Sequence, residues 1–239
     1  MAVESLYREP EEARTAIRWG ALEFHDVFKI YRSGPVETVA LRGLDLRVEP
    51  AELVAVFGPS GSGKSTMLQL AAGLDVPSAG EVRAAGRSLG MLGEADLAEY
   101  RGRGIAVVFQ SGNLWSSLTA VENVMLGLHL AGKPRPGPVA RRALETFGLG
   151  GRASTRASVL SGGEQQRVAI AAAAAREASL VLADEPTAEL DERNEEIVLD
   201  SLQSLRDSFG SAVVIVTHSP RVAAAADRVV ELRDGKVVA

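Results

Sequence analysis

Short apolar runs recur along the chain, and each is followed by a loop or by a helical pattern. Residues 53–57 read LVAVF and residues 212–217 read AVVIVT, without the polar alternation of a half-buried strand. Continuous runs of this length are typical of strands covered on both faces, as in a parallel sheet. The same pattern occurs at residues 53–57, 105–109, 180–183, 212–217 and 228–232.

The N-terminal part of the chain has a different period. Apolar and polar residues alternate over residues 21–31, where Leu22 and Phe24 are apolar, and the alternation continues at Leu44 and Leu46. A period of two predicts half-buried strands.

Helical patterns separate several of the buried runs, at residues 64–72, 161–176 and 194–209. Strands that alternate with helices predict an α/β fold with a parallel sheet and helical cover. Residues 119–159 break the alternation: they look helical, have no strand pattern and are divided by a Pro/Gly-rich stretch at 133–138. We therefore expect a helical lobe inserted in the α/β core.

Composition narrows the class of protein. The chain has 239 residues, 46% hydrophobic and 24% charged, which is ordinary for a folded domain with one good-sized core. Its formal net charge of -5 argues against a nucleic-acid partner, because such binders normally carry a basic domain. The sequence contains no cysteine, which excludes disulfides and cysteine-ligated metal sites.

The sequence has no apolar stretch near the roughly 20 residues that span a bilayer. Residues 1–20 mix Glu and Arg and lack a signal-peptide core, so they are interpreted as an N-terminal extension ahead of a domain at 21–239. We expect a soluble chain that stays on the side where it is made and that meets a membrane only through a partner.

A phosphate-binding loop is predicted at residues 58–66, which read GPSGSGKST between a buried strand and a helix. The glycines let backbone N–H groups approach phosphate oxygens, and the helix N-terminus adds a positive dipole end. Lys64 would neutralise the β- and γ-phosphates, and the Ser65 hydroxyl would ligate Mg²⁺. The predicted nucleotide-binding residues are Gly58, Pro59, Ser60, Gly61, Ser62, Gly63, Lys64, Ser65 and Thr66.

Two acids follow the buried run at 180–183, and they supply the second half of this chemistry. Asp184 ends the strand and would hold the Mg²⁺ shell beside the loop. Glu185 points differently and is positioned to orient or deprotonate an attacking water. The sequence thus predicts an ATPase with ATP and Mg²⁺ as cofactors.

Residues 160–167 read LSGGEQQR and resemble the signature motif of ABC ATPases. Ser161 and the glycines after it open a helix and would make a second anion site. The resemblance implies that Ser161, Gly162 and Gly163 of one subunit close over ATP held in the loop of another. The active unit would then be a head-to-tail pair.

Other positions resemble further elements of that family. Tyr31 resembles the aromatic residue that stacks on adenine, and Gln110 the glutamine that senses Mg²⁺ and couples to the membrane partner. Asp191 resembles an aspartate at the subunit interface, and His218 the histidine that contacts the γ-phosphate. The resemblance implies the catalytic residues Glu185, His218, Lys64 and Gln110, and the metal-site residues Ser65, Gln110 and Asp184.

The resemblance covers about residues 22–238. It implies a P-loop NTPase fold, the ABC ATPase cassette, with a mainly parallel core sheet, an N-terminal antiparallel β subdomain and an inserted helical subdomain at about 111–175. Within the family, the segments 109–114 and 118–124 and Ala183 before the acids look most similar to the lipoprotein-release and macrolide-export type. Amino-acid importers share several of these positions.

Three positions depart from the family pattern. Ala172 and Ala178 stand where Arg and Pro are expected, and Glu189 places an acid near Asp191 where small or amide residues are usual. The acid could alter the charge of the subunit interface and weaken pairing. No catalytic position is lost, so we predict active ATP hydrolysis.

The sequence therefore predicts the ATP-hydrolysing subunit of an ABC transporter, which drives a separate membrane permease, most simply an exporter, from the cytoplasmic face of the membrane. The complete catalytic set favours a homodimer. The alternative is a regulatory ABC ATPase that gates an extracellular activity without transport. A soluble ABC protein of translation or DNA repair would have two cassettes or a coiled-coil insertion, and this chain has neither. The transported substance is not readable, because the residues that select it lie in the membrane subunit.

Overall fold

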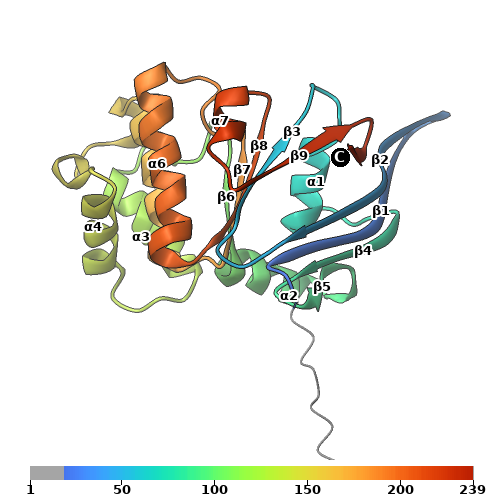
Figure 1. Cartoon of the computed structure of the whole chain (residues 1–239). Helices are drawn as coiled ribbons and strands as arrows, with labels where there is room; N and C mark the ends of the chain where they lie inside the picture. Colours follow the sequence, from blue (N-terminus) through green and yellow to red (C-terminus); the bar gives the residue numbers. More distant parts are fainter. Residues whose placement is uncertain (1–18, 239) are drawn as a thin grey trace, which may run out of the picture.

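The computed structural model describes residues 19–238, which form two sheets and a set of covering helices (Figure 1). The predicted extension at residues 1–20 falls outside the described residues except for Trp19 and Gly20. The division into extension, main domain and helical subdomain stays a prediction.

The larger sheet has six strands in the order β10-β9-β3-β8-β7-β6. All neighbouring pairs run parallel except β10 with β9. The strands are β3 (Leu53–Phe57), β6 (Ile105–Val108), β7 (Leu180–Asp184), β8 (Ala212–Thr217), β9 (Arg228–Arg233) and β10 (Lys236–Val238). The order places non-consecutive strands side by side, as helical crossovers require.

The continuous apolar runs are explained by burial on both faces of this sheet. Val181 and Val213 pack into one hydrophobic core with the helices, whereas Leu182 and Val214 pack into a second core on the other face. Because successive side chains of a strand point to opposite faces, a strand covered on both faces must be apolar at every position. The prediction of such a strand at 228–232 is wrong: in β9, Arg228 is exposed and Val229 is 49% exposed, and only Val230 and Leu232 are buried.

The smaller sheet is antiparallel, in the order β2-β1-β4-β5. Its strands are β1 (Leu22–Ser33), β2 (Val36–Val48), β4 (Ala79–Ala84) and β5 (Arg87–Ser88). The alternation seen in the sequence is correct here: Leu22, Phe24 and Leu44 are buried and belong to the second core. This sheet therefore covers the face of the large sheet that the first core leaves free.

The covering helices fall into two groups. Figure 1 shows α3, α4 and α6 at one end of the molecule, and α1 with the antiparallel strands at the other. Residues between β6 and β7 hold three of the helices and no regular strand of the described chain. The α-helices are α1 (Lys64–Ala71), α2 (Glu94–Glu99), α3 (Ala120–Leu130), α4 (Pro136–Thr146), α5 (Gly162–Arg176), α6 (Glu192–Phe209) and α7 (Pro220–Ala224). Short 3₁₀ helices lie at Leu89–Met91, Gly150–Arg152 and Ala157–Val159, and a π-helical turn follows α2 at Tyr100–Gly104.

Two boundaries differ from the sequence expectation. β6 ends at Val108, and Phe109, counted in the predicted buried run, is 45% exposed outside the strand. The stretch at 133–138 does divide two helices, α3 and α4, but the break between them ends earlier than predicted, because α4 begins at Pro136. Proline fits the first helical turn, where the backbone N–H would have no partner in the helix.

Between residues 19 and 238, every helix is too short or too polar to cross a lipid bilayer.

Candidate nucleotide-binding site

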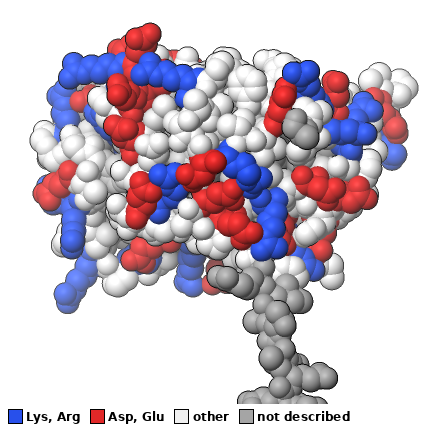
Figure 2. Space-filling view, viewed as in Figure 1, with Lys and Arg blue, Asp and Glu red and all other residues white. Residues whose placement is uncertain are grey.

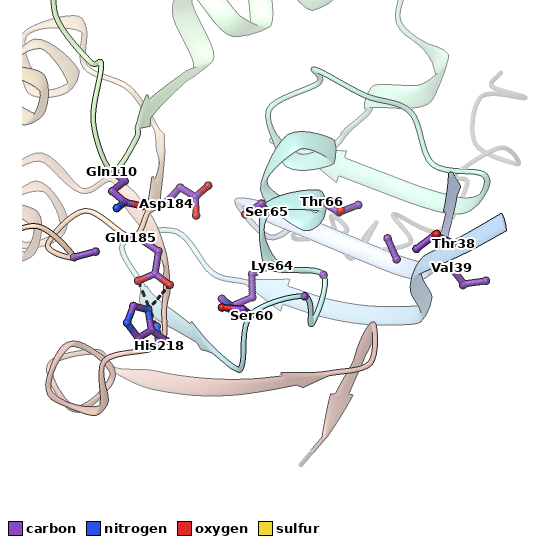
Figure 3. A pocket seen from close by; sticks show the side chains of 14 residues that line it. Thr38, Val39, Ser60, Lys64, Ser65, Thr66, Gln110, Asp184, Glu185 and His218 are labelled. Atoms are coloured by element: carbon purple, nitrogen blue, oxygen red, sulfur yellow. Dashed lines mark hydrogen bonds and ion pairs between the residues drawn. The ribbon is translucent and has the colours of Figure 1, made fainter. Parts of the chain in front are cut away.

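The carboxyl ends of four neighbouring parallel strands meet at one edge of the large sheet. β3 leads into the loop at 58–66, β6 leads toward Gln110, β7 ends at Asp184, and β8 leads to His218. Ligands of open α/β sheets bind at this edge. A cleft of about 500 Å³ lies there (Figure 3). It is lined by Thr38, Val39, Ala40, Ser60, Gly61, Gly63, Lys64, Ser65, Thr66, Gln110, Asp184, Glu185, Ala188 and His218.

The loop at 58–66 depends on its glycines for two different reasons. Gly61 and Gly63 have φ angles of 81° and 104°, which favour glycine. A Cβ at Gly63 would lie 2.6 Å from the Ala40 carbonyl oxygen, and one at Gly58 would lie 2.2 Å from that of Leu232. α1 starts at Lys64 without a side-chain cap, so its first N–H groups face the cleft as an anion site.

The Lys64 ammonium is held inside the loop. Its side chain is buried, and Nζ donates to the carbonyl oxygens of Gly58 at 2.7 Å and Pro59 at 2.9 Å. Both hydrogen-bond acceptors are neutral, so a phosphate oxygen that enters the cleft would be a stronger partner for the ammonium group.

Ser65, Asp184 and Gln110 bring hard oxygen donors to the same cleft. Oxygen ligands suit Mg²⁺, which keeps several waters and binds through one or two protein groups and substrate phosphates. The described residues contain no cluster of three His, Cys, Asp or Glu side chains that could hold a metal alone. The donor set fits a Mg²⁺ ion that arrives with a nucleotide.

The Asp184 carboxyl has a pKa above its ordinary value. Burial is the largest cause, and repulsion from Glu185 adds to it, whereas a hydrogen bond from Ser65 and the charge of Lys64 act in the opposite direction. A carboxylate that lacks full compensation is prepared for a cation.

Glu185 and His218 face each other across the cleft mouth. His218 Nδ1 lies 2.8 Å from Glu185 Oε1, and because a carboxylate only accepts, the proton is on Nδ1. The Glu185 backbone has φ 45°, a left-handed conformation that is costly for a residue other than glycine. Strain of this kind gathers at functional sites.

Gln110 is held at both its side chain and its backbone. Its Nε2 donates to Glu189 Oε1 at 3.0 Å. Gln166 of α5, buried at 4% exposure, donates from Nε2 to the carbonyl oxygens of Gln110 at 2.7 Å and Phe109 at 2.9 Å.

Tyr31 does not line the cleft, although its cross-strand partner Thr38 does. The Tyr31 hydroxyl donates to Asp75 Oδ2 at 3.1 Å, and Lys29 Nζ lies 4.9 Å from the centre of its ring. Adenine stacking by Tyr31 stays a prediction.

The signature residues lie outside the cleft lining as well. Ser161 caps α5: its Oγ accepts from the Glu164 N–H at 3.3 Å, and Glu164 Oε2 accepts from the Ser161 N–H at 2.9 Å. A Cβ at Gly162 would lie 3.3 Å from Leu190 of the same chain, and one at Gly163 would meet Asn194. The predicted second anion site at the start of α5 therefore lies outside this cleft, and it stays a prediction.

Asp191 caps α6, since its Oδ1 accepts from the Asn194 N–H at 2.8 Å. Hydrogen bonds from Asn194 are the main reason that the pKa of Asp191 lies below its ordinary value. The predicted interface role of Asp191 is not excluded by this cap and stays a prediction.

The remaining predicted loop residues support the cleft from behind. Gly58, Pro59 and Ser62 do not line it, and Ser62 is buried.

Sequence reasoning missed the contribution of β2 and of Ala188. Thr38, Val39 and Ala40 reach the cleft because the β1–β2 hairpin folds over the loop. The one available signal in the sequence was Gly63. A glycine at this position indicates that another backbone segment packs closely against the loop, but not which segment it is.

Acidic and basic side chains are interspersed on the face seen in Figure 2. The mixture of both signs on this face agrees with the small net charge of -5.

The fold and the cleft define a P-loop nucleotide hydrolase. A model of the ABC transporter family matches residues 41–188, and the chain belongs to that family. It is an ATP-binding ATPase cassette, and like other ABC ATPases it binds ATP with Mg²⁺. The predicted family, fold class and activity are confirmed.

The chain is similar to curated relatives and to solved cassettes. It is 46% identical over 222 residues to the lipoprotein-releasing system ATP-binding protein LolD of Anaeromyxobacter dehalogenans, covering 91% of this chain and 92% of that one. It is 41% identical to the macrolide export ATP-binding/permease protein MacB of Syntrophobacter fumaroxidans, covering 90% of this chain and 31% of that protein. A dimeric post-hydrolysis structure of the cassette MJ0796 with ADP and Pi matches with a TM-score of 0.83 and 37% identity, over 91% of this chain and 97% of that one.

Proposed function

We propose that the chain is the ATPase subunit of a LolD-like exporter. Two copies would dimerise around two ATP molecules and drive a separate membrane permease from the cytoplasmic face. The cargo to which its relatives point is a lipoprotein.

The observation that carries the proposal is that the signature residues at the start of α5 lie apart from the catalytic cleft of their own chain. The loop before α1 lines the catalytic cleft, whereas Ser161 at the start of α5 does not. A second copy would complete this cleft, and the Ser161 hydroxyl and the glycine N–H groups at its α5 start would then turn toward the phosphates. The dimeric neighbour that holds ADP and Pi supports this assembly.

The residues of the cleft divide the work of hydrolysis. The loop N–H groups and Lys64 would bind and orient the phosphates, while Asp184 and Ser65 would hold Mg²⁺. Bound Mg²⁺ would neutralise charge that develops on the phosphoryl oxygens. Glu185 would orient the attacking water and accept its proton, and His218 would hold the Glu185 carboxylate in place before it turns to the γ-phosphate.

A second groove supports a permease partner. It lies next to the segment after Gln110 and is lined in part by Leu114, Trp115 and Leu130. Trp115 is 67% exposed and Leu130 is 75% exposed, so two large apolar side chains face solvent beside one groove. Exposed apolar groups around a hollow are typical of protein interaction sites.

The catalytic proposal is tested by Glu185→Gln. We expect this variant to bind ATP, to form a stable dimer by light scattering, and to lose ATP turnover on the order of 100-fold or more. Glu196→Gln removes an exposed acid outside the cleft and should leave both properties unchanged. Unchanged turnover in Glu185→Gln would refute the role of Glu185, and an ATP-bound monomer would refute the shared site.

The partner proposal is tested by Trp115→Glu, measured with the permease in detergent or nanodiscs. We expect the isolated chain to keep its ATPase rate and to lose association with the permease. Full association would exclude this groove as the docking surface. A permease that associates but moves no lipoprotein in a release assay would favour the regulatory alternative.

A further inference from the structure

Glu189 is the acid that departs from the family pattern, and it lies close to the catalytic cleft. It follows Ala188, which lines the cleft, in the loop between β7 and α6. Gln110 comes from the loop after β6, the strand that neighbours β7 in the sheet. Parallel strands end at the same edge, so the two loops meet, and Gln110 Nε2 donates to Glu189 Oε1 at 3.0 Å.

The chemistry of the acceptor fixes which end of the Gln110 amide faces it. A carboxylate only accepts hydrogen bonds, so the amide NH₂ must turn toward Glu189. The carbonyl oxygen Oε1 is then the end left for the cleft, where Gln110 lies beside Asp184 (Figure 3). An amide without such a partner can flip and present its nitrogen, which is not a metal ligand, with nearly the same shape.

Backbone hydrogen bonds hold the segments that carry Gln110 and Glu189. The side-chain amide of buried Gln166 donates hydrogen bonds to the carbonyl oxygens of Gln110 and Phe109. Asn113 Nδ2 in turn donates to Gln166 Oε1 at 2.8 Å. On the other side, the Leu190 N–H donates to the Thr187 carbonyl oxygen at 3.0 Å, which closes a turn around Glu189. Gln166 thus holds the Gln110 backbone, and Glu189 restrains the rotation of the Gln110 side chain.

We propose that Glu189 is a positioning residue that orients the Gln110 amide, so that Oε1 faces the Mg²⁺ held by Asp184 and Ser65. The inference rests on the proposed metal-facing role of Gln110. Groups that orient a metal ligand typically change metal affinity 10- to 100-fold when they are removed.

The orientation itself is tested in the nucleotide-free protein by NMR of side-chain amides, with the Gln110 signal assigned by its loss in Gln110→Ala. We expect Glu189→Ala to move the Gln110 NH₂ protons upfield, because a charge-assisted hydrogen bond is lost. Glu192→Ala, which removes a nearby exposed acid without contact to Gln110, is the matched control and should not move them. Unmoved Gln110 signals in Glu189→Ala would overturn the proposal.

The consequence for the metal is tested by EPR titration of Mn²⁺ with ATP in the hydrolysis-deficient Glu185→Gln background. We expect Glu189→Ala to weaken Mn²⁺ binding about 10-fold. In a Gln110→Ala background the same change should have no further effect, since the two residues act through one hydrogen bond. Glu189→Gln should fall between, because its own amide can accept from Gln110 but can also flip.

Three outcomes separate the possible failures. Equal weakening in Glu189→Ala and Glu192→Ala would mean that charge alone acts, and it would overturn the positioning role. Weakening in Gln110→Ala but not in Glu189→Ala would overturn the role of Glu189 and leave the proposed function intact. Unchanged Mn²⁺ binding in Gln110→Ala would refute the metal-facing role of Gln110 itself and the inference with it.

Discussion

The beginnings of α1 and α5 are both helix N-termini preceded by glycine or serine, yet they differ in what satisfies their N–H groups. The α1 end has no side-chain cap and no acid in its first turn. The α5 end has a capping box between Ser161 and Glu164, and Arg152 pairs with Glu164 at 2.9 Å. The first end is open to an anion, whereas the second already has a carboxylate of its own chain.

This difference shows how one sequence signal can have two structural meanings. A capping box stabilises a helix start by roughly 1 kcal/mol, and the carboxylate also complements the helix dipole. An open end lacks that stabilisation until a ligand supplies it. The α5 end is built to be stable in the isolated chain, and the α1 end is built to bind.

The largest expected effect comes from Gly63→Ala before α1, compared with the same substitution at Gly162 in α5. Gly63→Ala combines a φ of 104° with a Cβ contact of 2.6 Å to a carbonyl oxygen, so we expect a loss of about 2–3 kcal/mol in unfolding free energy and of ATP turnover on the order of 100-fold. Gly162→Ala has its nearest contact at 3.3 Å, to the flexible end of Leu190, and should change stability by less than about 0.5 kcal/mol.

Denaturant unfolding would measure the stability of both variants, and a phosphate-release assay would measure their ATP turnover. If the two alanine variants lost equal stability, the contrast between the open and the capped end would be wrong.

A smaller effect is expected from removing the capping hydroxyl of α5, and the chain contains its own control. α3 starts with a second capping box, formed by Thr119 and Glu122. We expect Ser161→Ala and Thr119→Ala each to cost about 1 kcal/mol in unfolding free energy. Only Ser161→Ala should also lower the ATPase rate of the dimer, because only that hydroxyl lies in the signature.

Thermal unfolding and a coupled phosphate-release assay would compare these two variants. An equal loss of ATPase rate in both would assign the effect to helix stability alone.

The smallest effect is the pH dependence of the α5 cap. The backbone hydrogen bond from Ser161 is the main cause that holds the pKa of Glu164 below its ordinary value, and Arg152 adds to it. A lowered folded-state pKa means that the stabilisation is complete above about pH 4.5 and is lost as the pH falls through the folded-state pKa. The stability difference between wild type and Glu164→Gln should therefore be largest near neutral pH and vanish in acid.

Urea unfolding curves at a series of pH values would measure this difference. A gap that stayed constant in acid would show that the Glu164 charge does not contribute. The start of α1 has no acid in its first turn, so it makes no matching contribution to the pH dependence of stability.

Local chemistry made much of the fold readable in the sequence. A strand buried on both faces must be apolar at every position, so the runs at 180–183 and 212–217 are recognisable without any knowledge of their neighbours. The loop at 58–66 is also recognisable from local chemistry. Close approach of the backbone to phosphate requires glycine, and the loop must lead directly into a helix.

Contacts between distant segments were decided by the tertiary structure. The position of β2 over the loop, the packing of Tyr31 against Asp75, and the hydrogen bond from Gln110 to Glu189 each join residues that are separated in sequence and carry no mutual signal. The sequence marked Glu189 as unusual, and only the order of β6 beside β7 showed that its carboxylate meets Gln110. Periodicity and motif chemistry act within a few residues, whereas the partner of a side chain depends on how whole strands are arranged in the sheet.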